Sequence, residues 1–251
     1  MQIVSFVGTD VGAFVDEAAA KAKGVLVVNT PGVMASAVAE HTVGLVVGLA
    51  RGLFAQNEMV KRSGPLKGPT RELAGMAIGI VGMGAIGTRV ARILTTAFGC
   101  IVCYTSRTRK PTIETELGMR FLDTDELFAT SEAVVLLAAT TPETTGIVNG
   151  SRLSRARAGL LLVNTASATL VDPAALKRAL ETGRVASAAF DGYWIEPLPA
   201  PSSDPFGLLS LPDHLFVVTP HNAARTVGTW NRMIALAVDN IFRAVEQRGW
   251  L

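Results

Sequence analysis

Residues 78–87 decide the fold of this chain and read Ile78-Gly79-Ile80-Val81-Gly82-Met83-Gly84-Ala85-Ile86-Gly87. An apolar run leads into the glycines, and a helix-forming run, Thr88–Leu94, follows them. Gly82 permits a tight turn, Gly84 lets another molecule approach the backbone, and Gly87 lets the helix pack closely against the strand. The stretch therefore predicts a strand, a glycine turn and a helix in direct succession.

A turn of this kind presents unpaired backbone N–H groups and the positive end of a helix dipole, which together bind a pyrophosphate. We therefore predict a dinucleotide site made by the three glycines Gly82, Gly84 and Gly87 together with Ala85 and Ile86. The alternative is a glycine-rich turn that holds no ligand.

Short β-branched runs alternate with longer helical patterns on both sides of this turn. The predicted strands are Ile3–Val7, Val25–Asn29, Ala77–Val81, Cys100–Tyr104, Ala133–Ala138, Gly159–Asn164, Ala186–Phe190 and Leu215–Thr219. The predicted helices are Ala35–Arg62, Ile86–Phe98, Asp123–Ala129, Pro173–Thr182 and Thr226–Gln247. Most of the strands are continuous apolar runs, as expected where both faces of a sheet are covered. The order predicts an α/β fold, a doubly wound parallel sheet of the Rossmann type.

The strand after the glycine turn ends in Tyr104-Thr105-Ser106-Arg107-Thr108-Arg109. A site for NAD(H) usually has Asp or Glu at this strand end, where the carboxylate binds the ribose. Thr105 stands there instead, and Ser106, Arg107 and Arg109 follow. A hydroxyl and two guanidinium groups suit a 2′-phosphate, so we expect NADP(H) in preference to NAD(H). If the two arginines form only a solvated loop, the preference stays undecided.

The composition argues against several classes of function. The 251 residues carry a net charge of +2 without a basic run, which argues against nucleic-acid binding. Cys100 and Cys103 lack a second pair that would complete a metal site, and we interpret them as buried strand residues. We find neither a membrane-spanning segment nor the basic start of a signal peptide. We therefore expect no metal, no membrane association and a cytoplasmic location.

Further motifs occur on both sides of the glycine turn. They are Asn29-Thr30-Pro31-Gly32, Ala39-Glu40-His41, Thr141-Pro142-Glu143-Thr144, Asn164-Thr165-Ala166, Leu170-Val171-Asp172, Asp191, Glu196-Pro197-Leu198-Pro199 and Thr219-Pro220-His221. With these motifs in this order, the chain resembles the D-isomer-specific 2-hydroxyacid dehydrogenases over nearly its whole length. The resemblance implies hydride transfer between a nicotinamide cofactor and a 2-keto or 2-hydroxy acid or a related carbonyl compound.

The resemblance also implies roles for single residues. His221 matches the general acid/base of the family, and Glu196 matches the carboxylate that pairs with its imidazole. Asp191 matches a residue that holds the nicotinamide carboxamide, against which His221 would also lie. The other residues that the resemblance places along the cofactor are Ala139, Thr140, Pro142, Thr165 and Ala166. His41 and His214 receive no role.

Ser167 departs from the family pattern. The family has an arginine directly after Asn-Thr-Ala, and that arginine grips the substrate carboxylate. Ser167 stands at this catalytic position and has no charge and no fork of donors. The substrate is then not an ordinary 2-keto acid, or another cation such as Arg225 replaces the grip, or the activity is lost. We favour the alternative interpretation of Arg225, a solvent-facing residue at the start of the last helix.

The chain also lacks the first strands of the family's flavodoxin-like substrate domain. We divide it into a remnant of that lid domain at residues 1–32, a dinucleotide-binding domain at 33–225 and a final helix at 226–251 that returns toward the remnant. Two strands and one helix cannot cover a sheet, so apolar surface is expected near the N-terminus. The apolar face of Ala35–Arg62 suits packing between two copies, which favours a homodimer.

The sequence therefore favours an NADP(H)-dependent oxidoreductase acting on a small molecule. Its rival is a dinucleotide-binding protein that has lost catalysis and serves as a cofactor-sensing or interaction module. A third interpretation is that the chain is a piece of a longer protein. The sequence names neither the substrate nor the direction of the reaction.

Overall fold

The computed structural model describes residues 1–249 except 10, 13 and 63–69. The chain forms two compact units. The larger unit is continuous, Ala39–Ala223, and the smaller unit combines Met1–Val38 with Ala224–Leu251. The sequence predicts the corresponding boundaries at 32/33 and 225/226.

The larger unit is built on a parallel sheet. Its strands are β3 (Ala77–Val81), β4 (Ile101–Thr105), β5 (Arg120–Phe121), β6 (Ala133–Leu136), β7 (Leu160–Asn164), β8 (Val185–Asp191) and β9 (Phe216–Thr219). Among the described residues they pair in the order β5-β4-β3-β6-β7-β8-β9, and every pair is parallel. The predicted doubly wound parallel sheet is confirmed. The direction of winding reverses between β3 and β6, which is where ligands bind in open sheets of this kind.

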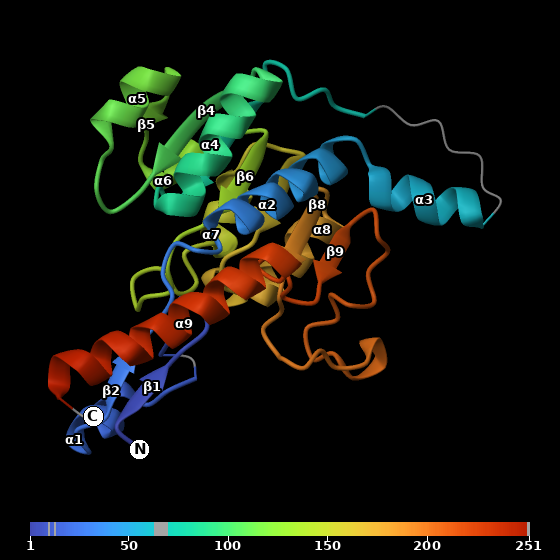
Figure 1. Ribbon diagram of the computed structural model, residues 1–251. Helices are drawn as coiled ribbons and strands as arrows, with labels where there is room; N and C mark the ends of the chain where they lie inside the picture. Colours follow the sequence, from blue (N-terminus) through green and yellow to red (C-terminus); the bar gives the residue numbers. More distant parts are fainter. Residues whose placement is uncertain (10, 13, 63–69, 250–251) are drawn as a thin grey trace. The chain divides into compact units, whose positions relative to one another are not determined.

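Helices cover both faces of this sheet (Figure 1). The helices of the unit are α2 (Ala35–Ala50), α3 (Leu53–Lys61), α4 (Ala85–Phe98), α5 (Pro111–Leu117), α6 (Thr124–Thr130), α7 (Gly150–Arg155) and α8 (Pro173–Glu181), with 3-10 turns at Ala168–Leu170 and Pro201–Ser203. Helices α2 and α4 pack on the face that carries Ile78 and Ile80. Helices α6, α7 and α8 pack on the opposite face, which carries Val81.

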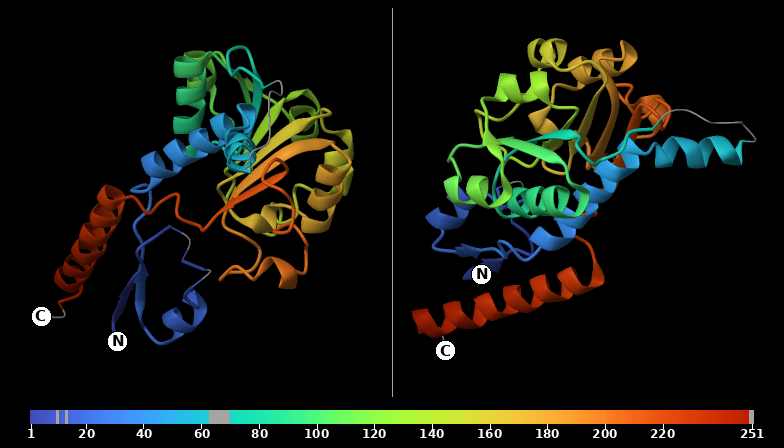
Figure 2. Two further views of the ribbon diagram at one scale, coloured as in Figure 1. Left: turned by 90° about the vertical axis from the view of Figure 1, so that its right-hand side faces the viewer. Right: turned by 90° about the horizontal axis from the view of Figure 1, so that it is seen from above.

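The single helix predicted over Ala35–Arg62 is wrong. Gly52 adopts a left-handed backbone conformation with φ of 61°, and it separates α2 from α3. The two helices meet at a bend of 60°, which the right-hand view of Figure 2 shows. Glycine populates this conformation without the steric penalty of a Cβ, which is why the chain turns here.

The described residues contain no single helix that is long and apolar enough to cross a membrane. Helices α2 and α3 reach the required length and apolarity only when they are taken together across their bend. Several residues of α2, among them Val43, Val46 and Leu49, are buried in the core of the larger unit.

The smaller unit joins the two ends of the chain. It contains β1 (Ile3–Ser5), β2 (Leu26–Val28), α1 (Glu17–Ala22) and α9 (Val227–Arg248). Strands β1 and β2 pair in parallel. The Ser5 hydroxyl donates to the Ala237 carbonyl of α9 (2.8 Å), and the Asn240 amide donates to the Asn29 carbonyl (3.0 Å). The last helix therefore closes onto the first strands.

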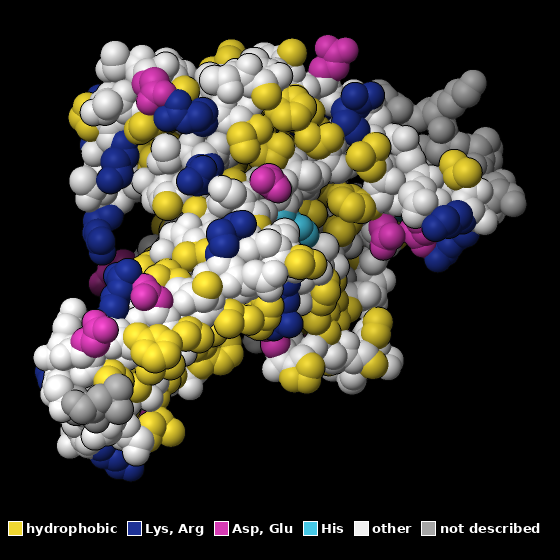
Figure 3. Space-filling view, viewed as in Figure 1, with side chains coloured by type: hydrophobic (Ala, Val, Ile, Leu, Met, Phe, Trp, Pro, Cys, Tyr) yellow, Lys and Arg dark blue, Asp and Glu magenta, His cyan; other side chains and the backbone are white. Residues whose placement is uncertain are grey.

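One side of α9 is apolar and exposed. Trp230, Ile234, Val238 and Phe242 recur every four residues, and each exposes 41% or more of its surface. Figure 3 shows apolar side chains gathered along this helix. The sequence predicts exposed apolar surface near the N-terminus, and in this unit α9 carries most of it.

Candidate active site

The glycine turn sits where β3 meets β6. Gly82 has φ of 106°, and a Cβ there would lie 2.5 Å from the backbone nitrogen of Ala138. A Cβ on Gly87 would collide with the carbonyl oxygen of Gly82. Both glycines are therefore required for packing within the turn, as the sequence predicts for the first and third positions of the motif.

Gly84 is different, because a Cβ built on it meets nothing within 4 Å. Gly84 is also the N-cap of α4, and no side chain caps that end of the helix. The first N–H groups of α4, beginning at Ala85 and Ile86, thus face an open space at the switch point of the sheet. These residues fit the pyrophosphate of a dinucleotide.

The two predicted phosphate-binding arginines, Arg107 and Arg109, have different partners in the loop after β4. The guanidinium of Arg109 binds both carboxylate oxygens of Glu114, and this contact lowers the pKa of Glu114 to about 2. Arg109 also lies over the Phe121 ring, 6.0 Å from its centroid. The Ser106 hydroxyl donates a hydrogen bond to the Thr108 carbonyl (2.7 Å). Arg109 is therefore engaged within the loop.

Arg107 makes no ion pair with the residues that the structure describes. Its charge is close enough to Glu143, in the loop after β6, to contribute to lowering the pKa of that carboxyl. A hydrogen bond from Thr141 is the larger cause of the lowered pKa. Arg107 is thus the guanidinium at this strand end that is available for an anion.

The other predicted cofactor residues lie at the carboxyl ends of β6 and β7. Ala139, Thr140 and Pro142 are exposed in the loop after β6, where the Thr144 hydroxyl donates to the Ala139 carbonyl (2.7 Å). Thr165, after β7, shares a 2.7 Å hydrogen bond with Thr42 of α2. Ala166 follows it, and its N–H donates to the Asn164 side chain (3.0 Å). Because carboxyl ends of parallel strands share one edge, these loops lie along the same edge as the glycine turn.

His221 and Glu196 form the predicted pair. Nδ1 of His221 lies 3.0 Å from both carboxylate oxygens of Glu196, so Nδ1 carries the hydrogen and Nε2 is left for another partner. The side chains are 61% and 40% exposed, so the contact contributes little to stability and acts mainly to orient the ring. A Cβ on Gly192 would lie 2.9 Å from Glu196 Oε1, so a larger residue here would displace the carboxylate from His221.

Asp191 is buried and holds the turn that follows β9. Its carboxylate accepts hydrogen bonds from the backbone N–H groups of Asn222 (3.0 Å) and Ala223 (2.8 Å). It also accepts one from the Thr219 hydroxyl (2.6 Å). His221 itself has φ of 53°, a left-handed conformation that is rare outside glycine. The carboxylate thus stabilises an unfavourable turn, and its contact with the nicotinamide stays a prediction.

His41 lies in this cluster, although the sequence assigns it no role. Its Nε2 lies 3.1 Å from the Thr219 hydroxyl and 3.8 Å from Asp191 Oδ1. A single histidine in a helical pattern does not indicate this contact, since its partners Asp191 and Thr219 lie 150 and 178 residues later in the chain. His214, the other histidine without a role, is exposed in a loop.

The Ser167 side chain makes hydrogen bonds within its own loop. Its hydroxyl lies 2.7 Å from that of Thr169 and accepts from the Thr169 N–H (3.3 Å), so it caps the short 3-10 turn at Ala168–Leu170. The Asn164 side chain donates to the Ser167 carbonyl (3.0 Å). Ser167 therefore shapes the loop after β7 without placing a charge there.

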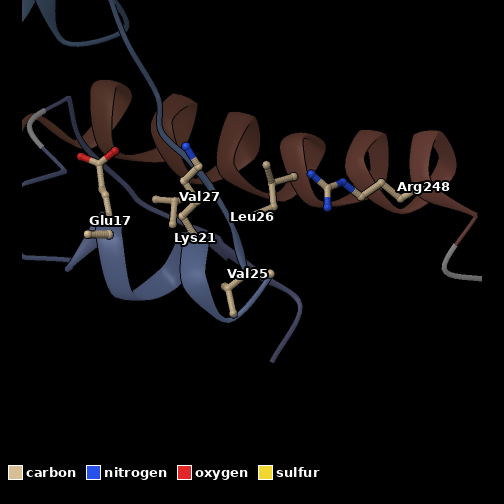
Figure 4. Close-up of a pocket in the computed structure, with 8 residues that line it drawn as sticks. Glu17, Lys21, Val25, Leu26, Val27 and Arg248 are labelled. Carbon is tan, nitrogen blue, oxygen red and sulfur yellow. The ribbon is translucent and has the colours of Figure 1, made fainter.

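Two other features do not belong to this site. A cavity in the smaller unit, drawn in Figure 4, is lined by residues of α1, β2 and α9, and none of the predicted site residues lines it. Cys100 is buried and Cys103 half-buried, and burial raises the pKa of both thiols. No cluster of metal-ligating side chains occurs in the part of the chain that the structure describes.

Comparison with known proteins identifies the scaffold. Residues 43–223 match the model of the D-isomer specific 2-hydroxyacid dehydrogenase NAD binding domain. A glyoxylate reductase of Aeropyrum pernix is 36% identical over 236 residues, which cover 90% of this chain and 68% of the relative. A hydroxypyruvate reductase of Thermotoga maritima is 34% identical, over 91% of this chain and 73% of the relative.

A solved glyoxylate reductase from Paecilomyes thermophila superposes with a TM-score of 0.86 at 30% identity, over 98% of this chain and 73% of that one. The family model spans more than half of the chain, and its residues include the glycine turn, Glu196 and His221. The relatives are reductases by name, of glyoxylate and of hydroxypyruvate, and the family model describes an NAD binding domain. This chain belongs to the D-isomer-specific 2-hydroxyacid dehydrogenase family.

Proposed function

We propose that this protein is an NADP(H)-dependent oxidoreductase that interconverts a 2-keto acid, or a related carbonyl compound, and its alcohol. The observation that supports the proposal most directly is the fixed geometry of His221 on Glu196. No packing requirement explains this exposed pair, since both side chains are more than one third accessible. A proton donor held beside the carboxyl ends of the strands is what a carbonyl reductase needs.

The chain's own groups account for the movement of the proton. Nδ1 of His221 is engaged with Glu196, so Nε2 delivers the proton to the carbonyl oxygen, or removes it from the alcohol in the reverse direction. Glu196 stabilises the charged imidazolium and fixes the direction of the ring. The nicotinamide cofactor, when bound, supplies or accepts the hydride. Asp191 has an oxygen, Oδ2, with a single protein donor, which is compatible with a contact to the nicotinamide carboxamide.

The preference for NADP(H) rests on the end of β4. Arg107 is available there, whereas Arg109 is bound to Glu114. We assign the 2′-phosphate contact to Arg107, and the Ser106 hydroxyl joins it only by turning away from the Thr108 carbonyl. Arg109 then shapes the loop from within.

A catalytically inactive dinucleotide-binding protein is the second candidate. The observation in its favour is Ser167, whose hydroxyl is used to cap a turn and cannot replace a bidentate guanidinium. Losing such a contact typically costs several kcal/mol of transition-state stabilisation. The two candidates differ in turnover and agree on cofactor binding.

The first experiment measures turnover. NADPH is mixed with a panel of 2-keto acids, aldehydes and ketones, and oxidation is followed at 340 nm in the wild type, in His221→Asn and in Glu196→Gln. We expect kcat to fall by about 10²–10⁴-fold in His221→Asn, with less loss in Glu196→Gln. NADPH affinity, measured by fluorescence titration, stays unchanged in both. Binding without turnover of any carbonyl by the wild type would favour the inactive protein.

The second experiment measures cofactor preference. Arg107→Ala removes a charge-assisted contact worth roughly 1.5–3 kcal/mol, so the Kd for NADPH rises about tenfold to a hundredfold. The Kd of the same variant for NADH is the internal control and stays within twofold or so of the wild-type value. Equal Kd values for NADPH in variant and wild type would show that the loop is merely solvated.

The predictions of a homodimer and a cytoplasmic location remain predictions. The argument for the dimer was the apolar face of Ala35–Arg62. The structure buries much of α2 in its own core, so only α3, with Leu53 and Val60 exposed, retains apolar residues for a second copy.

A further inference from the structure

We infer that His41 is a positioning residue: it orients Asp191, which holds the turn that carries His221. The inference deepens the proposed function and rests on it. It rests on which atom donates each hydrogen bond between His41, Thr219 and Asp191, three residues of the larger unit.

The donor and the acceptor of each hydrogen bond follow from the number of hydrogens that each side chain carries. The side chain of Asp191 is 3% exposed and receives two backbone N–H groups, so it is an acceptor. Thr219 has one hydroxyl hydrogen, and its shortest contact is to Asp191 Oδ1 at 2.6 Å. That hydrogen therefore points at the carboxylate. Nε2 of His41, at 3.1 Å, must then be the donor to Thr219.

His41 decides between two orientations of the Thr219 hydroxyl. The same hydroxyl has a second possible acceptor, the carbonyl oxygen of Phe190 at 3.3 Å. A donor at His41 requires a lone pair of Thr219 to face it, which restrains rotation of the hydroxyl while its hydrogen lies on Asp191. Without that donor the hydrogen can turn to Phe190, and the buried carboxylate loses one of its partners.

The orientation of the Asp191 carboxylate affects the active-site turn, because the carboxylate binds the backbone there. Asn222 and Ala223 directly follow His221, and both donate their N–H groups to Asp191. The chain then leaves the larger unit between Ala223 and Ala224. The φ of 53° at His221 needs such support, since a relaxed backbone would turn the imidazole away from Glu196.

The test compares His41→Leu, which removes the donor, with His41→Gln, which restores an N–H group of similar reach. We expect kcat in His41→Leu to fall about tenfold to a hundredfold, while KM for the carbonyl and the Kd for NADPH stay within a factor of about two. His41→Gln recovers most of kcat. His214→Leu is the matched control, because it makes the same change at an exposed histidine outside the cluster.

A second readout does not depend on turnover. Amide hydrogen exchange at Asn222 and Ala223 is expected to be roughly tenfold faster in His41→Leu than in the wild type, with exchange in β3 and β6 unchanged. If the wild type reduces no carbonyl, the proposed function fails and this exchange measurement still decides the inference. Unchanged exchange at both amides, no recovery in His41→Gln, or faster exchange throughout the sheet would each overturn it.

Discussion

Backbone strain at His221 is balanced by the residues around it. An L-residue in the left-handed region is destabilised by about 1–2 kcal/mol. A hydrogen bond to a charged group contributes roughly 1.5–3 kcal/mol, and Asp191 accepts one from each of the two residues after His221. The carboxylate is therefore sufficient to hold the turn, and a neutral residue at 191 would leave the strain unopposed.

Gly192 offers a direct way to separate orientation from stability. A Cβ at this position lies 2.9 Å from Glu196 Oε1, the mobile end of a side chain, so the carboxylate moves aside and releases the His221 ring. In Gly192→Ala we expect kcat to fall by about tenfold or more. Steady-state kinetics with the carbonyl that the wild type reduces would measure this.

The control for that variant is Gly183→Ala. Gly183 has φ of 71° and nothing within 4 Å of its Cβ position, so it carries a similar backbone penalty of about 1–2 kcal/mol away from the site. Denaturant unfolding should show comparable losses of stability in the two variants. A loss of kcat in Gly183→Ala as large as in Gly192→Ala would attribute the effect to stability alone.

The role of a single residue was predictable where a local sequence motif indicates that role. The roles of Gly82 and Gly87 followed from the spacing of the motif, and Cβ contacts at both positions agree with it. The involvement of His41 was not predictable, because its partners lie on β8 and β9 and no local pattern links them. The engagement of Arg109 with Glu114 depends on α5, a helix too short to show a period.

At the scale of elements, the central strands and the short helix α6 were predictable, whereas α5 and α7 were not. Strand β3 was predicted with its observed bounds, and most of the other strands differ by one or two residues at an end. Helices α5 and α7 have seven and six residues, fewer than two turns, and are too short to show a helical period of apolar residues. The bend between α2 and α3 had a signal in Gly52, whose left-handed conformation only the structure establishes.

The loop after β4 provides a prediction about pH. The Arg109 guanidinium and the Tyr104 hydroxyl hold the pKa of Glu114 at about 2. Because the folded-state pKa lies below the unfolded value of about 4.3, this contact stabilises the protein above that value and is lost as the pH falls toward 2. We expect Glu114→Gln to flatten the decline in unfolding free energy between pH 4.5 and 2, about the range set by these pKa values.

Urea unfolding at stepped pH measures this slope. Glu72→Gln is the matched control, since Glu72 is exposed and makes no ion pair among the residues that the structure describes. Parallel curves for wild type and Glu114→Gln would mean that the contact with Arg109 does not persist in solution.

At the scale of the molecule, the two units differ in how the chain supplies them. The larger unit uses one unbroken segment, and its parallel strands follow from sequence patterns that lie close together. The smaller unit is assembled from both ends of the chain, so no local pattern shows which surfaces meet. The exposed face of α9 was not predicted, because the apolar surface expected from the sequence was that of the first strands.

The hydrogen bond from Ser5 to Ala237 joins residues 232 positions apart. During synthesis, the first strands therefore emerge from the ribosome long before the helix that will cover them. The intervening segment, Ala39–Ala223, holds every strand of its own sheet and can fold in the meantime. The smaller unit is thus completed only after the larger one has been made, because it needs residues from both sides of that segment.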